Sequence, residues 1–436
     1  MNLPARLGGG RSLLAVLCLS GCATMGAPSV GPGDIPSLQA RVAREPEDGT
    51  LKLQLAAALA SADRCGEAVE IAREGRILRP SDPAGPLIVG RCLERAGNLE
   101  GALQVYARYL ESYGNAGGAD VVRGRRLLTF QTHAREEAQR ALAREEELAP
   151  GDPETVGVFP FLVDGGPRHQ PLSAGLAHML TTDLALLGRF SMVERVETNA
   201  LLEELELPRE LVDPATAARA GRILQASRMV LGTVRIPSED EAALGGNIVL
   251  ETGELVQPLS LEGDLANLLD LEKSFALQLA EDLGYQVSEA ERQRILENRP
   301  GSLAAFLAFS RGLLEEDLGN FESAAALYRE AVQLDPSYGQ ARSRLDGVSG
   351  AQVVVGTEFG QLPFLRGGAE AARVGAGLHL LAGALGSSLL DLASHQSERA
   401  TLNVGTVNPL IETVLEEALV LPLLEAVILV TITIPR

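Results

Sequence analysis

Residues 156–161 read VGVFPF, a short apolar run that predicts a buried β-strand, ended at Pro160 because proline cannot donate to a sheet ladder. Residues 229–234 read MVLGTV and predict another buried strand. Between them, residues 172–187 carry apolar side chains at helical spacing. Strands that alternate with helices are typical of an α/β sheet domain, which we place at residues 151–296.

Residues 190–195 read FSMVER and predict a further strand, along which successive side chains point to opposite faces. We expect Glu194 and Arg195 to form a structural ion pair at the sheet edge, with contact to a partner as the alternative. Three more elements complete the domain: a helix that begins at Asp213 and Pro214, a hairpin over 247–262 and a helix over 265–283.

Four short motifs follow one another in this part of the chain, namely FPF (159–161), VER (193–195), LEEL (202–205) and LGTV (231–234). In order and spacing they resemble the curli-secretion lipoprotein family, the CsgG type, whose relatives include the flagellar FlgO proteins. The resemblance implies an α/β envelope domain that binds protein partners. In the secretion members such a domain also builds a ring and contributes two long membrane hairpins to a channel.

A channel would need longer strands than this pattern offers. A strand that crosses a membrane takes about 9–11 residues, whereas the candidate hairpin at 243–262 predicts strands of about six, interrupted at Gly253 and Pro258. A channel subunit is therefore the alternative, and a scaffold the main prediction.

Helical repeats are predicted on both sides of the sheet domain. A shift of 34 residues superposes Leu55 on Val89, Ala56 on Gly90, Leu59 on Leu93 and Ala68 on Ala102. This period and these small residues resemble tetratricopeptide repeats. We expect three units over 37–150, the third of them degenerate, and another over 298–346, where Gly312 and Tyr328 repeat the spacing of the second unit. Generic amphipathic helical hairpins are the alternative.

The first residues have the charge order of an export signal. Arg6 and Arg11 precede an apolar stretch at 13–19 that is too short to span a bilayer. The stretch runs into LSGC (19–22), which resembles the lipobox of bacterial lipoproteins. The resemblance implies a signal peptide over 1–21, and an ordinary secretory signal is the alternative.

The same resemblance implies that the thiol of Cys22 carries lipid, including palmitate. Two or three acyl chains hold an N-terminus at a membrane while the folded chain stays outside the bilayer. Residues 22–36 are rich in Gly and Pro and predict a flexible, lipid-anchored tether. Ala23 follows the cysteine, and in such lipoproteins this indicates the outer membrane, here its periplasmic face.

The composition excludes several classes of function. The chain has 436 residues, 38 of them basic and 58 acidic, so it would repel nucleic acid. Its two lysines, Lys52 and Lys273, follow no glycine-rich phosphate loop, and none of its five histidines is followed four residues later by a second histidine, as the metalloprotease helix requires. We therefore expect no catalytic residue, no metal and no cofactor in a protein that is not an enzyme.

Two features of the first repeats are candidate sites. Cys65 and Cys92 are the remaining cysteines of the mature chain and lie in adjacent repeats, which makes a disulfide in an oxidising compartment a hypothesis, with buried free thiols as the favoured interpretation. Arg91, Glu94 and Arg95 fall on the polar side of the first helix of the second repeat, the side that lines the groove in such repeats. They are candidates for binding an acidic or mixed-charge peptide, although solvated charges are the favoured interpretation.

Residues 347–436 are rich in glycine and poor in charge, and they indicate no function. β-branched residues favour a strand at 352–355 and a final strand at 426–434, with a helix over 368–393 between them.

Together these patterns predict an α+β multidomain protein in which tetratricopeptide-like helical hairpins flank an α/β CsgG-like sheet domain. The predicted function is that of a non-enzymatic outer-membrane lipoprotein, a periplasmic scaffold or adaptor in envelope assembly or secretion. Its expected partners are envelope proteins or peptides and, through the lipid anchor, the membrane, with a homo-oligomer as an open alternative. The alternative function is that of a subunit of a CsgG-type outer-membrane secretion channel.

Overall fold

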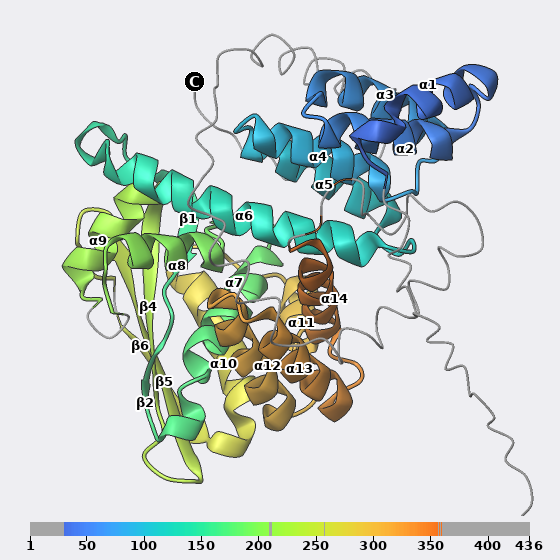
Figure 1. Cartoon of the computed structure of the whole chain (residues 1–436). Helices are drawn as coiled ribbons and strands as arrows, with labels where there is room; N and C mark the ends of the chain where they lie inside the picture. The colour runs from blue at the N-terminus through green and yellow to red at the C-terminus, as the bar shows by residue number, and fades with distance from the viewer. Residues whose placement is uncertain (1–29, 209–211, 257, 356, 358, 360–436) are drawn as a thin grey trace, which may run out of the picture.

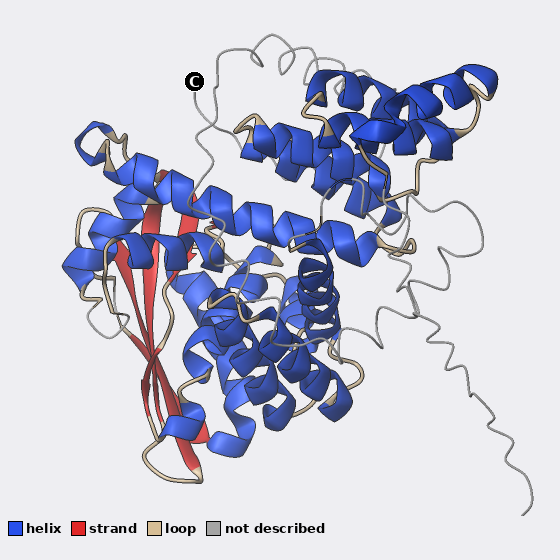
Figure 2. Ribbon diagram, viewed as in Figure 1, coloured by secondary structure: helices blue, strands red, loops and turns tan. Residues whose placement is uncertain are grey.

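The computed structural model describes residues 30–208, 212–256, 258–355, 357 and 359. Helices α1–α5 form one group, the long helix α6 lies between that group and the rest, and a twisted sheet stands at one side of the molecule (Figures 1 and 2). Short 3-10 helices occur at Pro32–Asp34, Glu145–Glu147, Pro167–His169 and Leu265–Asn267. The expected helix at 368–393 and strand at 426–434 lie outside the described residues.

The first five helices pack as hairpins. Their bounds are α1 (Ile35–Arg44), α2 (Gly49–Ser61), α3 (Cys65–Leu78), α4 (Ala84–Arg95) and α5 (Leu99–Tyr113). Asp48 begins α2 by accepting hydrogen bonds from the backbone N–H groups of Thr50 and Leu51, and Asn98 accepts one at the start of α5. Because α2 packs on α3 and α4 on α5 across short turns, the period seen in the sequence corresponds to pairs of helices.

The third hairpin expected before residue 150 is instead one helix, α6 (Ala119–Leu142). That expectation was wrong because residues 125–142 contain no glycine, proline or asparagine to end the first helix. Helix α6 packs against α5, α8 and α14. Its Val121 and Val122 belong to the apolar cluster of the first hairpins, while Ala134 and Ala138 belong to a cluster with α8 and α9.

The sheet has six strands, β1 (Asp152–Val158), β2 (Leu162–Asp164), β3 (Ser191–Met192), β4 (Ala226–Arg235), β5 (Glu241–Leu250) and β6 (Leu259–Asp264). The order is β3-β1-β4-β5-β6, with β2 also paired to β4. Strands β1 and β2 run parallel to β4, while β5 is antiparallel to both β4 and β6. The predicted strand at 229–234 lies within β4, whereas only residues 156–158 of the predicted strand at 156–161 lie in a strand, at the end of β1.

Strand β5 is longer than the strands expected for the hairpin at 243–262. It has ten residues, not about six, because pairing with β4 begins at Ala243 and continues past Gly245 and Gly246 to Leu250. The glycines admit neighbouring side chains, since a Cβ at Gly246 would lie 2.5 Å from the ring of Phe275. Close packing against α10 thus allows this strand to be longer than its turn-like composition indicates.

Helices cover both faces of the sheet. They are α7 (Leu172–Ala185), α8 (Arg195–Glu204), α9 (Pro214–Ile223) and α10 (Leu268–Asp282). Val158, Val230 and Leu244 point into the main core with α7 and α10, whereas Met229 and Val249 pack with α8 and α9. The alternation that predicts strands is therefore the alternation between two buried faces.

The predicted strand at 190–195 is only partly a strand. Ser191 and Met192 pair with β1, but Glu194 is the N-cap of α8 and Arg195 its first residue. Glu194 and Glu197 form a capping box, which begins the helix where the sequence pattern suggested a strand end.

Four further helices follow the sheet: α11 (Glu289–Glu297), α12 (Leu303–Asp317), α13 (Phe321–Leu334) and α14 (Gly339–Val354). The strand expected at 352–355 is wrong, since these residues end α14. Val348, Ala351 and Val354 are buried at helical spacing, and this packing outweighs the strand preference of the three consecutive valines.

Glycines set the closest helix contacts. A Cβ at Gly90 in α4 would lie 2.3 Å from the Tyr106 ring in α5, and one at Gly312 in α12 would lie 2.5 Å from the Tyr328 ring in α13. Helices α6 and α14 approach more closely still, because a Cβ at Gly124 would lie 2.0 Å from the backbone nitrogen of Ala351.

Candidate functional site

Glu94 lies at the centre of a buried polar cluster between α4, α5 and α6. It accepts hydrogen bonds from the hydroxyls of Tyr106 (2.8 Å) and Thr129 (2.6 Å), and from Nε of Arg125 (3.0 Å). Its side chain is 9% exposed. Glu94 is therefore committed to holding three helices together, which corrects its expected place among partner-binding residues.

The C-terminal helices repeat this cluster at the same spacing. Glu316 lies four residues after Gly312, as Glu94 lies four after Gly90, and in each hairpin the tyrosine that donates to the glutamate follows it by 12 residues. Tyr328 donates to Glu316 at 2.7 Å, and Arg344 on α14 donates to it at 2.8 Å. Burial is the largest single effect and would lower the pKa of Arg344, but Glu316 together with Tyr328, Glu194 and Asp317 outweighs it, so the pKa is raised.

Arg91 and Arg95 form a slot on the outer face of α4. Their Cζ atoms lie 4.4 and 4.5 Å from the ring centroid of Phe359, which follows α14 and is 1% exposed. Arg95 also donates to the backbone oxygen of Ala60 at 2.7 Å. Burial lowers the pKa of Arg91 to about 10, with the positive charge of nearby Arg125 adding to the effect. Two of the three residues predicted to bind a partner, Arg91 and Arg95, therefore contact Phe359 of the same chain.

Arg195 is a buried ion-pair residue and does not lie on a strand edge. It is 4% exposed, pairs directly with Asp317 and lies 3.7 Å from Glu316. Asn199 donates to the other carboxylate oxygen of Asp317 at 2.9 Å. The expected Glu194–Arg195 pair is therefore replaced by pairs between α8 and α12, residues that are distant in sequence.

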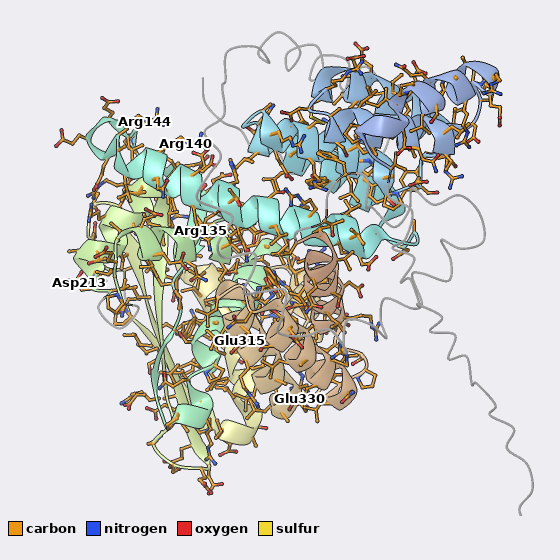
Figure 3. The ribbon with its side chains drawn as sticks, in the orientation of Figure 1. Arg135, Arg140, Arg144, Asp213, Glu315 and Glu330 are labelled. Carbon is orange, nitrogen blue, oxygen red and sulfur yellow. A yellow bond between two sulfur atoms is a disulfide. The ribbon has the colours of Figure 1, made fainter. Side chains whose placement is uncertain are left out.

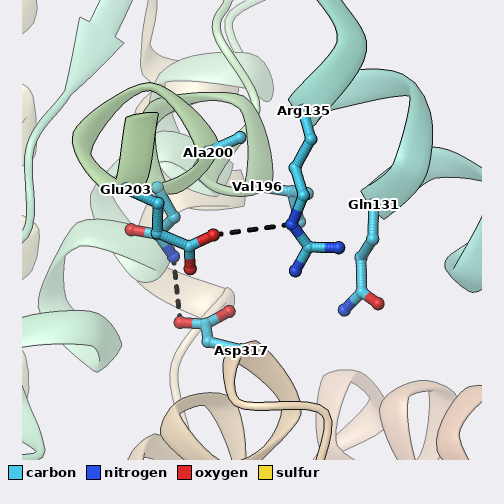
Figure 4. Close-up of a pocket in the computed structure, with 7 residues that line it drawn as sticks. Gln131, Arg135, Val196, Ala200, Glu203 and Asp317 are labelled. Carbon is cyan, nitrogen blue, oxygen red and sulfur yellow. Dashed lines mark hydrogen bonds and ion pairs between the residues drawn. The ribbon is translucent and has the colours of Figure 1, made fainter. Parts of the chain in front are cut away.

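A small pocket opens beside these pairs, at the junction of α6, α8 and α12 (Figure 4). It is lined by Gln131, Arg135, Val196, Asn199, Ala200, Glu203 and Asp317. Arg135 and Glu203 face one another across it at 3.5 Å. Arg135, Arg140 and Arg144 follow one another along α6 and past its end (Figure 3). The lining offers charged and amide groups, and it contains no histidine base and no hydroxyl or thiol nucleophile.

One of the two lysines lies in the core. Lys273 is fully buried, pairs with Asp183 and lies 3.2 Å from Glu272. Asn298 donates to the second oxygen of Asp183 at 2.8 Å. Burial, together with the charge of Asp183, raises the pKa of Glu272 to about 8. Because all three charged groups are buried, we regard this cluster as part of the framework.

The structure describes the residues of one of the two cysteine predictions. Cys65 at the start of α3 and Cys92 in α4 are joined by a disulfide, with a Cα–Cα distance of 5.5 Å. Cys22 lies outside the described residues. Within the described ranges, no group of three His, Cys, Asp or Glu residues is arranged to hold a metal ion. No helix in the same ranges combines the length and apolarity needed to cross a membrane.

One segment of the sheet domain matches a known protein family. This segment contains β1–β4, α7–α9 and most of β5. Residues 150–246 match the CsgG family model. The description of that family is curli production assembly/transport component CsgG. The match covers under a quarter of the chain and supports a CsgG-type domain where the four motifs indicated one.

Other comparisons add little. No curated protein matches the chain. Among solved structures, a chain from "Structure of Naa15/Naa10 bound to HypK-THB" is 12% identical with a TM-score of 0.20, over 78% of this chain and 41% of that one. This chain therefore spans less than half the length of that protein, and at such a score the likeness carries no argument.

Proposed function

We propose that this chain is a lipid-anchored, non-enzymatic scaffold that recruits proteins for curli-type secretion or related envelope assembly. The observation that carries the proposal is the CsgG-type match at residues 150–246, in a domain packed against helical hairpins. The name of that family connects it with assembly and transport, and the predicted export signal and lipobox support a location at the periplasmic face of the outer membrane.

The hairpins support a binding role. We interpret α2–α5 and α12–α13 as tetratricopeptide-like repeats, because Gly90 and Gly312 each lie under a tyrosine of the partner helix. Helical arrays of this kind present extended surfaces to protein partners. Ile77 at the end of α3 is 80% exposed, so a probe placed there reports on the surface of this array.

A site-specific photocrosslinker tests the proposal without disturbing the fold. We would place it at Ile77, which is exposed on the hairpins, and at Leu255, which is 50% exposed in the turn between β5 and β6. A scaffold should give adducts with other envelope proteins from Ile77. If neither position gives an adduct with another protein in native membranes, the scaffold proposal is wrong.

The alternative is a secretion-channel subunit, which the ten residues of β5 favour more than the sequence suggested. In this structure, however, β5 is paired on both sides, by β4 and β6. A channel subunit should give adducts between copies of this chain from Leu255, and single-channel steps in planar-bilayer recordings of the purified protein. Such steps would replace the scaffold proposal by the channel.

A further inference from the structure

The slot on α4 has the geometry of a recognition site for a flat ring. Arg91 and Arg95 are four residues apart on one helix, so their side chains lie one turn apart on the same face. Each guanidinium lies within 4.5 Å of the Phe359 ring centroid, inside the range of a cation–π contact. Phe359 and Val354 both belong to the apolar cluster of α2–α5, so the ring of Phe359 also packs against apolar side chains.

Arg95 already pairs with Asp63 at 3.0 Å at the exposed edge of the slot, so the unmet need for negative charge lies at Arg91. Glu94, the acid between the two arginines in sequence, is already bonded to Tyr106, Arg125 and Thr129. Nη1 of Arg91 is buried and has no hydrogen-bond acceptor among the described residues. A buried guanidinium donor without an acceptor is costly, and a carboxylate is the group that best satisfies it.

We propose that the slot formed by Arg91 and Arg95 recognises a peptide in which an aromatic residue adjoins an acidic one, and that Phe359 is a tethered occupant which such a peptide displaces. The sequence around the occupant has this pattern, since residues 357–359 read TEF. The proposal rests on the proposed function in that it names the class of ligand the helical hairpins would recruit.

A tethered occupant has a measurable effect on affinity. Because Phe359 belongs to the same chain, its effective concentration at the slot is on the order of millimolar, and a free peptide must compete with it. Removing the ring by Phe359→Ala should therefore tighten binding of a free peptide by about tenfold or more.

The test uses the purified full chain and a fluorescent peptide with the sequence of residues 355–361, VGTEFGQ. We expect the peptide to bind the F359A protein at least tenfold more tightly than the wild type. Replacing Phe by Ala in the peptide should abolish binding, and replacing Glu by Gln should weaken it. In the F359A background, Arg91→Lys, which keeps the charge but loses the planar fork, should weaken binding, whereas Arg44→Ala on the exposed face of α1 should not.

A second variant guards against loss of folding. Phe359→Leu keeps an apolar side chain in the cluster and removes only the aromatic face, so it should give an affinity between those of the wild type and F359A. Equal peptide affinity for the wild type, F359L and a folded F359A, or no binding to any of them, would overturn the proposal. If the wild type is a dimer and F359A is a monomer, the Phe359 in the slot belongs to a second copy of this chain. That result would also overturn the proposal.

The outcome is separable from that of the scaffold proposal. Peptide binding is measured with purified components, whereas the crosslinking at Ile77 is measured in native membranes. Binding of the peptide, with no adducts to another protein from either Ile77 or Leu255, would keep the slot and reject the scaffold, and the reverse result would reject the slot alone.

Discussion

The crossing of α6 and α14 gives the sharpest test of the packing, because two glycines meet there. A Cβ at Gly124 would lie 2.0 Å from Ala351 N and 2.1 Å from Gly350 C, both backbone atoms that cannot rotate away. Ordinary contact begins at 3.4 Å, so in Gly124→Ala the two helices must separate by about 1.4 Å. A gap of that size removes most of the dispersion energy along the crossing.

The magnitude follows from two opposing effects. Overpacking of this kind costs about 1–3 kcal/mol, and we take the upper end because the clash is with backbone. Alanine is the better helix former by about 1 kcal/mol, which offsets part of the loss. The free energy that keeps α6 and α14 closed should therefore fall by about 2 kcal/mol, which corresponds to about 30-fold faster exchange of their protected amides.

A matched control lies in the partner helix. Gly347 is also inside α14, but a Cβ there would meet no atom within 4 Å. Gly347→Ala should therefore slow exchange, since it gains helix propensity without a clash. Native-state hydrogen exchange followed by mass spectrometry measures both variants. If G124A and G347A change protection in the same direction, the close crossing described here is wrong.

Three further predictions concern the anchor, the disulfide and the buried core. Cys22→Ala should abolish metabolic palmitate labelling and leave a soluble or uncleaved protein, and equal labelling of the variant would contradict the lipobox interpretation. Cys92→Ala should lower the free energy of unfolding without reductant by about 3–4 kcal/mol, because the bridge to Cys65 closes a loop of 27 residues, whereas alkylation of both thiols in the denatured, unreduced wild type would show that no bridge exists. The pKa of Glu272 is raised from 4.5 to about 8, so between these values the folded chain keeps a proton that the unfolded chain has released, and the free energy of unfolding falls as the pH rises. Glu272→Gln should remove that fall in urea unfolding at pH 5 and pH 8, and an unchanged slope would refute the assignment.

Sequence patterns predicted correctly those elements that depend on residues close together in the chain. Asp213 accepts a hydrogen bond from Thr216 at the start of α9, and the run at 229–234 lies inside β4, because capping and alternation depend on neighbours in sequence. Gly90 could be predicted as a helix contact because its role repeats after a fixed period. The match between the second unit and the last, which aligns Gly90 with Gly312 and Tyr106 with Tyr328, also aligns Glu94 with Glu316, and this repeated glutamate indicates a structural role for Glu94.

The remaining features depend on residues that are distant in sequence. Arg195 looked like a strand residue because its partners, Glu316 and Asp317, are more than a hundred residues away. The three valines at 353–355 favoured a strand, but Val354 packs with the first hairpins only because α14 crosses α6. Phe359 carried no local signal, since its position is defined by two arginines on α4.

The position of α6 decides how the scaffold proposal can be examined by truncation. The sequence pattern favours removing residues 37–150 as one unit. That cut would remove α6 and with it Ala134 and Ala138 from the cluster they share with Leu201 on α8, and it would also uncover α14. Loss of partner binding in such a variant would report damage to the sheet domain and not the absence of a binding surface. Deletion of residues 35–113 removes α1–α5 and the slot but keeps the predicted anchor and the packing of α6 against α8 and α14, so this truncation separates recruitment from folding.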